Sequence, residues 1–158
     1  MSTLHIRNAQ ISDAEQLSEM IYENTHAMLK PHYNQLQWET FVRYYSVPVL
    51  REKISAQAVF CAEINNKIVG TIALDGDFVV GFYTRLENMR QGIGKLLMDH
   101  LESYAASLGL TELQLGASPE GLAFYYKNGW QKVRDFTIYH YNVGYEETLM
   151  SKIIAPKQ

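Results

Sequence analysis

Two glycines stand close together at the point where a strand is expected to give way to a helix. They are Gly92 and Gly94, flanked by Arg90 and Lys95 in the segment 89–95. The first four N–H groups of a helix have no partner within it and carry the positive end of the helix dipole. Glycines let a phosphate approach these groups closely, and the two basic residues add positive charge. The spacing predicts a pyrophosphate site, although a tight strand-to-helix turn would use the same glycines.

Two common phosphate-binding motifs do not match this segment. A P-loop needs a glycine five residues before its Gly-Lys pair and a serine or threonine after it, whereas this chain has Met89 and Leu96 at those positions. A dinucleotide-binding fingerprint needs a third small residue after the two glycines, and that position holds Leu97. The residues therefore exclude both of these motifs.

A second motif follows one helix and one strand later. It consists of Ala123, Tyr125, Gly129 and Trp130, in the pattern small-x-Tyr-x-x-x-Gly-aromatic. Together with segment 89–95, it resembles the GNAT family of N-acetyltransferases, whose acetyl-CoA loop reads Gln/Arg-x-x-Gly-x-Gly/Ala. The two motifs occur in the family's order, and the predicted order of strands and helices is similar to the family's over nearly the whole chain.

Three positions depart from the family pattern. Met89 stands where the family has Gln or Arg, Leu86 where it often has proline, and Ser118 where it often has asparagine. None of the three removes the backbone N–H groups that would hold a pyrophosphate. The departures bear on the affinity for the cofactor and on the shape of the loop.

The resemblance implies that an amine attacks the thioester carbonyl of acetyl-CoA directly, with no covalent enzyme intermediate. The strand at residues 82–84 would pair with the pantetheine arm and polarise the carbonyl through an N–H, and a bulge at Gly81 could open the sheet edge there. Tyr125 would donate a proton to the departing thiolate, because the two groups have similar proton affinities. The residues that the resemblance assigns to the cofactor are Phe82, Tyr83, Thr84, Met89, Arg90, Gln91, Gly92, Ile93, Gly94, Lys95 and Ser118.

The sequence assigns no general base. No carboxylate lies inside the predicted strand at 78–84, the histidines are scattered, and proton removal through water is equally consistent with the residues. No metal is expected, because the His and Cys residues lack metal-ligand spacing. The side chains that could serve as a base are Asp75, Asp77, Glu87, Glu63, His26 and His32.

The acceptor pocket is expected to form from the first two helices and the strand ends that face them. Tyr22, His26, Tyr33 and Trp38 fall in this part, and residues 1–84 carry a net charge of −3. Aromatic rings and negative charge suit a cationic amine with some apolar bulk, on a small molecule or a peptide, although each ring could equally belong to the core. The alternative function is a non-catalytic acyl-CoA-binding or interaction module on the same fold.

The composition is that of an ordinary globular domain. The chain has 158 residues, of which 47% are hydrophobic, and a formal net charge of −3, which argues against non-specific binding to nucleic acid. Positive charge is concentrated in residues 85–95 and 119–134, each with a net +2, and these segments hold the two motifs. No apolar run approaches the roughly 20 residues of a membrane helix. The single Cys61 suits a reducing compartment, so we expect a cytoplasmic enzyme. We expect it to act without nucleic acid or membrane. Small domains of the family that this chain resembles often form homodimers, so a homodimer is possible here.

Hydrophobic periodicity predicts one α/β domain over residues 1–158, with a mixed, mostly antiparallel sheet flanked by about four helices. The Ser12 hydroxyl is expected to cap the first helix in a capping box at residues 12–15. Further helices are expected at 36–45, 92–108 and 119–128, with a short turn at 49–54. Strands are expected at 4–7, 58–64, 67–74, 78–84, 113–116, 130–135, 137–141 and 147–150.

Overall fold

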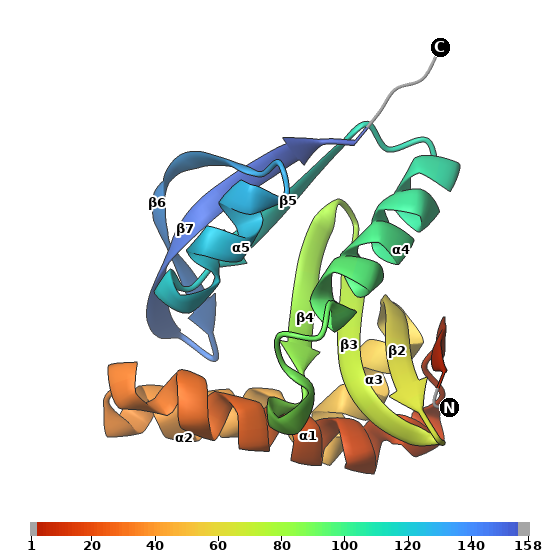
Figure 1. Cartoon of the computed structure of the whole chain (residues 1–158). Coiled ribbons are helices and arrows are strands. Elements are labelled where there is room, and N and C mark those ends of the chain that lie inside the picture. Colours follow the sequence, from red (N-terminus) through yellow and green to blue (C-terminus); the bar gives the residue numbers. More distant parts are fainter. Residues whose placement is uncertain (1–2, 155–158) are drawn as a thin grey trace.

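Seven strands form one sheet in the spatial order β1-β2-β3-β4-β5-β7-β6 (Figure 1). The computed structural model describes residues 3–154. All neighbouring strands are antiparallel except β4 and β5, which are parallel, so the sheet is mixed and mostly antiparallel as predicted. The strands are β1 Leu4–Asn8, β2 Ala58–Ile64, β3 Lys67–Asp75, β4 Phe78–Thr84, β5 Glu112–Ala117, β6 Gln131–His140 and β7 Val143–Ile153.

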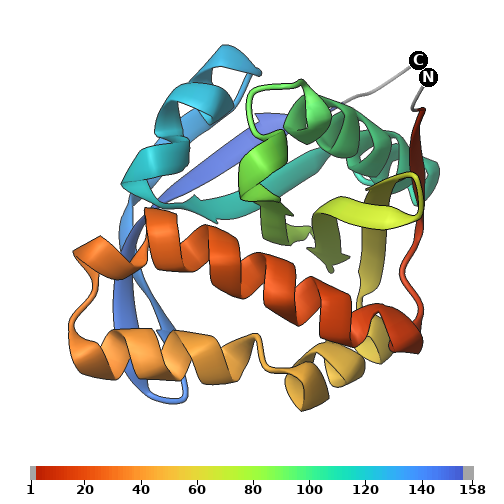
Figure 2. The ribbon, with the colours of Figure 1, turned by 60° about the horizontal axis from the view of Figure 1, so that its bottom comes forward.

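Helices cover both faces of this sheet (Figures 1 and 2). The helix α4 packs on β2, β3 and β4, while α1 and α3 pack on the other face and α2 lies against β6 and β7. None of the helices between residues 3 and 154 is long and apolar enough to cross a membrane. The α-helices are α1 Ala14–Met28, α2 Gln35–Tyr44, α3 Val47–Ala56, α4 Ile93–Ser107 and α5 Leu122–Lys127.

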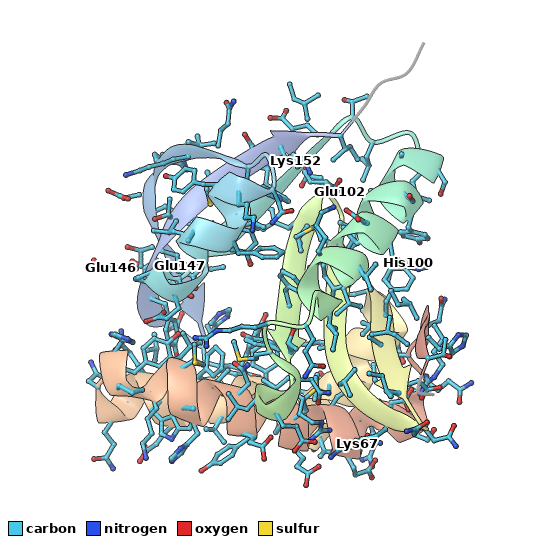
Figure 3. The ribbon with its side chains drawn as sticks, in the orientation of Figure 1. Lys67, His100, Glu102, Glu146, Glu147 and Lys152 are labelled. Carbon is cyan, nitrogen blue, oxygen red and sulfur yellow. The ribbon has the colours of Figure 1, made fainter. Side chains whose placement is uncertain are left out.

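The helix α4 is held close to the sheet by its apolar face. Leu97 and Leu101 are fully buried and belong to the largest core cluster, together with Trp130. A Cβ at Gly70 of β3 would lie 2.8 Å from the Leu97 side chain, so the close approach of helix and sheet depends on this glycine. Lys152 of β7 adds a salt bridge of 2.9 Å to Glu102 of α4 (Figure 3). These contacts hold α4 in place on the sheet, so the glycine pair at its N-terminal end has a fixed position.

The opposite face of the sheet buries the lone cysteine. Cys61 packs with Leu17 of α1, Leu50 of α3 and Ile68 of β3. Burial raises the pKa of the Cys61 thiol to about 12, which leaves it protonated and inert. This side chain is a core residue, as its alternating strand pattern indicates.

The start of the first helix differs from the prediction. Ser12 lies inside a short 3-10 helix, Ile11–Asp13, and its side chain makes no capping hydrogen bond. The Asp13 carboxylate instead accepts from the Gln10 N–H at 2.7 Å and pairs with Arg7 at 2.8 Å. A charged acceptor forms the stronger hydrogen bond, and the Arg7 guanidinium keeps the pKa of Asp13 below its usual value.

The α/β fold class is confirmed, but three other boundaries were wrong. The strands expected at 130–135 and 137–141 are one long strand, β6, and the strand expected at 147–150 is the longer β7. The two form a single hairpin whose turn residues Tyr141 and Asn142 have positive φ angles of 50° and 66°. The turn expected at 49–54 is part of the ten-residue α3, in which Pro48 occupies the first turn where its missing N–H costs no hydrogen bond. Residues 3–154 therefore contain five α-helices, where about four were expected.

Candidate active site

The sheet opens between its two parallel strands. β4 pairs with β5 only at Phe78–Gln114 and Val79–Leu115, and beyond these pairs the strands separate. A cavity of about 140 Å³ lies at this opening, lined by residues 78–83 of β4 and by Leu115, Gly116 and Ser118. Strands that separate leave backbone groups of β4 facing the cavity, where an extended ligand can lie beside them.

A bulge in β4 turns the strand at this cavity. The register runs from Ala73–Val80 to Thr71–Tyr83, so β4 has one residue more than β3 between these pairs. Gly81, in the bulge, has a φ of +58°. The extra residue of a bulge has no hydrogen-bonding partner on the neighbouring strand, and the bulge changes the direction of the N–H groups beside it. The bulge expected at Gly81 is thus present, and Phe82 and Tyr83 line the cavity beside it.

The turn before α4 has the open geometry that an anion requires. Arg90 and Gly92 have φ angles of +64° and +83°, and Gly92 is the residue that precedes the helix. A Cβ at Gly92 would meet no protein atom within 4 Å. The space in front of the first N–H groups of α4 is therefore open, and Arg90 and Gln91 are exposed beside it. Lys95 is exposed but forms an ion pair with Asp99 at 2.8 Å, so its charge is partly compensated.

A buried asparagine of α1 connects the strand to this turn. Asn24 donates from Nδ2 to the Thr84 carbonyl at 2.7 Å, and the same nitrogen lies 3.9 Å from the Met89 sulfur. Thr84 and Met89, both assigned to the cofactor by the sequence, are thus joined through one side chain. Met89, at the position that the family usually gives to Gln or Arg, is half-buried and contacts Asn24 through its sulfur.

Tyr125 reaches the cavity from α5. Its ring packs edge-on against Trp130, with ring centres 6.0 Å apart, and at 6.3 Å from Phe82. A Cβ at Gly121 would lie 2.9 Å from the Tyr125 ring, so the absence of a side chain there makes room for it. Burial, together with the negative charge of Glu147, raises the pKa of Tyr125 above its usual value. The phenol therefore stays protonated throughout the physiological pH range, and its proton affinity in the free protein is above the value that the sequence argument matched to a thiolate.

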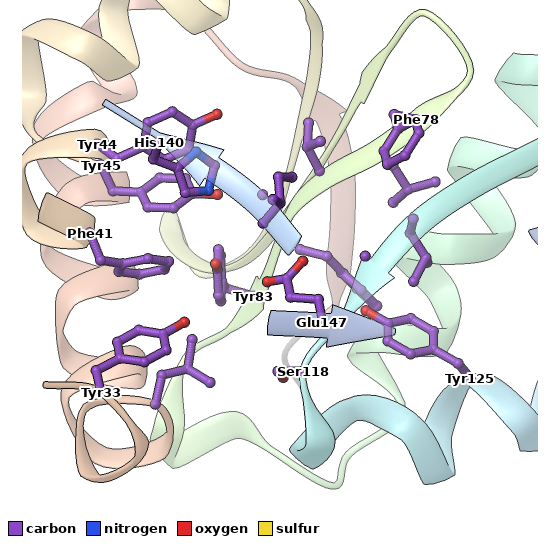
Figure 4. A pocket seen from close by; sticks show the side chains of 18 residues that line it. Tyr33, Phe41, Tyr44, Tyr45, Phe78, Tyr83, Ser118, Tyr125, His140 and Glu147 are labelled. Carbon is purple, nitrogen blue, oxygen red and sulfur yellow. The ribbon is translucent and has the colours of Figure 1, made fainter. Parts of the chain in front are cut away.

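Glu147 of β7 lies in the same cavity (Figure 4). Its carboxylate lies over Gly116 of β5, where any side chain would collide with it. No basic group of residues 3–154 forms an ion pair with Glu147. Burial raises the pKa of this carboxyl to about 7, so at neutral pH it can both accept and release a proton.

Aromatic side chains form the wall opposite Tyr125. They come from α2, from the turns on either side of it, and from β4. Ring centres are 5.0–5.7 Å apart in the pairs Tyr33–Phe41, Phe41–Tyr45 and Tyr45–Tyr83, with the rings tilted in the first two pairs and edge to face in the third. His140 of β6 stacks on Tyr44 with ring centres 3.9 Å apart. Burial and the nearby Lys53 lower the pKa of His140 to about 4, so this imidazole is neutral.

The structure brings together only part of the predicted site. Phe82, Tyr83, Ser118 and Tyr125 line the cavity, with the turn 89–95 at the head of α4. Of the four residues predicted for the acceptor, Tyr33 lines this cavity. The other three form a separate aromatic cluster on α1 and α2 and do not line it: Tyr22, His26 and Trp38.

None of the candidate bases named from the sequence is among the residues that line the cavity. Glu63 pairs with Arg7, Glu87 with Lys67, and Asp77 accepts from the Gln114 amide. His32 contacts Glu120. Glu147 was not predicted from the sequence, although the strand pattern includes it. Every second side chain of a strand lies on the same face, and in β7 one such row holds Val143, Tyr145, Glu147 and Leu149. Among the described residues, no group of three or more His, Cys, Asp or Glu could hold a metal ion.

Comparison with known proteins agrees with this arrangement. A family model described as an acetyltransferase (GNAT) domain matches residues 29–144. A GCN5-related N-acetyltransferase from Rhodopseudomonas palustris has a similar structure, with a TM-score of 0.87, 22% identity and 97% of each chain covered. PaiA N-acetyltransferase from Thermoplasma acidophilum, in complex with coenzyme A, has a TM-score of 0.81 and 23% identity, covering 96% of this chain and 99% of its own.

A more distant structure has the same fold. An aminoglycoside 6'-N-acetyltransferase complexed with coenzyme A has a TM-score of 0.69 and 16% identity, covering 98% of this chain and 99% of its own. No curated protein matches the chain. At these identities the solved structures establish the fold, and the family model spans most of the sequence. The chain therefore belongs to the GNAT acetyltransferase family.

Proposed function

We propose that this protein transfers an acetyl group from acetyl-CoA directly to the nitrogen of an amine. The observation that carries the proposal is a cavity at the opening between β4 and β5 that is lined by the bulged end of β4 and by Tyr125. The head of α4 lies next to it, because a Cβ at Gly94 would be 3.4 Å from the ring of Phe82, which lines the cavity. The coenzyme A bound in two proteins of similar structure supports the same choice of cofactor.

The residues of this chain fit the parts of that cofactor. The open space at Gly92 and the first N–H groups of α4 suit a pyrophosphate. The bulge at Gly81 suits a pantetheine arm lying along β4, with a backbone N–H directed at the thioester oxygen. Tyr125 would protonate the departing sulfur. Acetyl-CoA supplies the activated acyl group, and the chain supplies the binding, the orientation and the protons.

The test is the melting temperature of the purified protein with and without acetyl-CoA. A ligand at 100 times its dissociation constant stabilises by about 2.7 kcal/mol, which corresponds to a rise of about 5–10 °C for a domain of this size. Thiol release with a panel of amines would then establish transfer. A rise without thiol release for any amine would favour the non-catalytic acyl-CoA-binding module, and no rise would contradict cofactor binding.

A matched pair of variants makes the test specific to the anion site. Gly92 and Gly109 flank α4, have φ angles of +83° and +89°, and are both free of side-chain neighbours. Gly92→Ala and Gly109→Ala therefore carry similar backbone strain, and both should lower the melting temperature. Only Gly92→Ala should also weaken the response to acetyl-CoA. Equal responses in the two variants would remove the turn before α4 from the cofactor site.

A further inference from the structure

We propose that Glu147 receives the ammonium group of the acceptor and takes its proton, in a pocket that accepts an amine carried on an apolar stem. This inference rests on the proposed acetyl transfer and adds the base and the class of acceptor. It follows from where the carboxylate lies, from the neutrality of its surroundings, and from the rings that enclose it.

Residues from both sides of the opening between β4 and β5 surround Glu147. The carboxylate lies over Gly116, on the strand that separates from β4, and Tyr125 and the bulge of β4 line the same cavity (Figure 4). An amine in contact with Glu147 would thus share one space with the group proposed to protonate the thiolate. The next residue along β7, Glu146, is exposed (Figure 3), because successive side chains of a strand point to opposite faces.

Glu147 is the one carboxylate among the residues that line the cavity. The tyrosines around it stay protonated, since burial raises their pKa values, and the negative charge of Glu147 adds to this effect. His140 is neutral, so nothing on the wall offers Glu147 a cation. The titratable groups that face it or its neighbours are Tyr33, Tyr44, Tyr45, Tyr83, Tyr125, His140, Lys53, Glu120 and Asp75.

The wall beyond the carboxylate is apolar. Leu29, Tyr33, Phe41 and Ile138 line it, and the cavity of about 140 Å³ has room for several carbon atoms. Rings beside a cationic nitrogen add cation–π attraction, and the apolar stem of the amine gains from leaving water. A carboxylate next to the amine, as in an α-amino acid, would be repelled by Glu147. The pocket therefore selects an amine on an aliphatic or aromatic stem.

Glu147 and Tyr125 both take up and release a proton during the transfer. Glu147 takes one proton from the ammonium, and the free amine forms the new C–N bond at the thioester carbon. The C–S bond breaks, Tyr125 gives its proton to the sulfur, and the nitrogen returns a proton to the Tyr125 phenolate. Glu147 then releases its proton to water, so that ammonium and thioester become amide, thiol and one proton. Protonation of Glu147 also removes the charge that raises the pKa of Tyr125, which makes the phenol a better acid when the thiolate departs.

Binding of three related probes tests the ammonium site without any turnover. The probes are 2-phenylethylamine, 2-phenylethanol and phenylalanine, titrated by calorimetry into the full-length protein. We expect the amine to bind about tenfold or more tightly than either of the others, as a charge-assisted contact would give, and Glu147→Gln to remove this preference. Glu146→Gln is the matched control and should keep it. Equal binding of the three probes to the wild-type protein, or a preference that survives in Glu147→Gln, would overturn the proposal.

Kinetics test the proton transfer. At pH 7.5 we expect Glu147→Gln to lower kcat/KM for 2-phenylethylamine about 100-fold, while the rise in melting temperature with acetyl-CoA is kept. The pH at which kcat/KM rises should move from near neutrality to the pKa of the amine itself, because only the free base then reacts. Gly116→Ala, which displaces the carboxylate without removing it, should show the same trend more weakly. An unshifted pH profile, or loss of the acetyl-CoA response in Glu147→Gln, would overturn the role as base; absent thiol release by the wild-type protein would instead contradict the proposed transfer.

Discussion

Replacing Glu147 with glutamine should stabilise the free protein at alkaline pH. The pKa of this carboxyl rises from 4.5 to about 7 on folding because the group is buried without a counter-charge. A shift of this size corresponds to about 3 kcal/mol, and we halve it to about 1.5 kcal/mol because the side chain keeps partial access to water. For a domain of this length the gain in melting temperature is about 3–6 °C.

The sign of the effect depends on pH. Below pH 4.5 the carboxyl is protonated in the folded and the unfolded chain alike, so it contributes nothing. Between pH 4.5 and about 7 the folded state holds more protons than the unfolded state, and the free energy of unfolding of the wild-type protein falls as pH rises. Above pH 7 the full cost is present. The advantage of Glu147→Gln should therefore be near zero at pH 4.5 and complete at pH 8.5.

Thermal unfolding followed by circular dichroism, at pH 4.5 and pH 8.5 and without ligand, measures this difference. Glu146→Gln on the exposed side of β7 is the control, and it should change the melting temperature little at either pH. A Glu147→Gln protein that melts at or below the wild-type temperature at pH 8.5 would refute the reasoning. So would the same gain at both pH values, because a charge-independent packing change would then explain it.

Three further variants test other parts of the structure. Tyr125→Phe keeps the ring packed on Trp130 and should lower turnover about tenfold or more while acetyl-CoA still raises the melting temperature; unchanged turnover would remove the proposed acid. Leu97→Ala empties a fully buried site under α4 and should cost about 2–5 kcal/mol in urea unfolding, and a loss below about 1 kcal/mol would mean that the cavity collapses. Asn24→Ala removes the hydrogen bond to the Thr84 carbonyl and should both destabilise by about 1 kcal/mol and weaken acetyl-CoA binding, whereas unchanged binding would show that the turn is fixed without it.

The sequence predicts the parts of the fold that depend on local patterns. The boundaries of β2 and β4 are those expected, since each is a short apolar run between turn residues. The start of α4 at the glycine pair was also predicted, because a glycine at a strand-to-helix turn is a local signal. Ser12 misled the prediction of the first cap, because the choice between Ser12 and Asp13 is decided by Arg7 on the neighbouring strand.

The wall proposed for the acceptor was predicted only in part, since Tyr33 was named from the sequence and Glu147 was not. Tyr33 and Glu147 lie 114 positions apart in the chain and meet only because β7 is inserted between β5 and β6. The pattern that favoured Tyr22 and Trp38 was real, since these rings do cluster, but the cluster lies on the helices outside the cavity. Burial of Glu147 likewise depends on Gly116, whose missing side chain matters only once β5 and β7 are paired.

The residues proposed to hold the cofactor and those proposed for the acceptor come from different parts of the chain. The backbone features proposed to hold the cofactor lie within residues 81–95, in one continuous segment of β4 and α4, and Ser118 is the one cofactor residue assigned outside it. The wall proposed for the acceptor comes from residues 29–45 and 138–147, which meet only through the sheet. Substitutions in the second set can change the acceptor without disturbing the first. The acceptor of this chain therefore has to be read from Glu147 and its aromatic wall, because the glycine turn carries information about the cofactor alone.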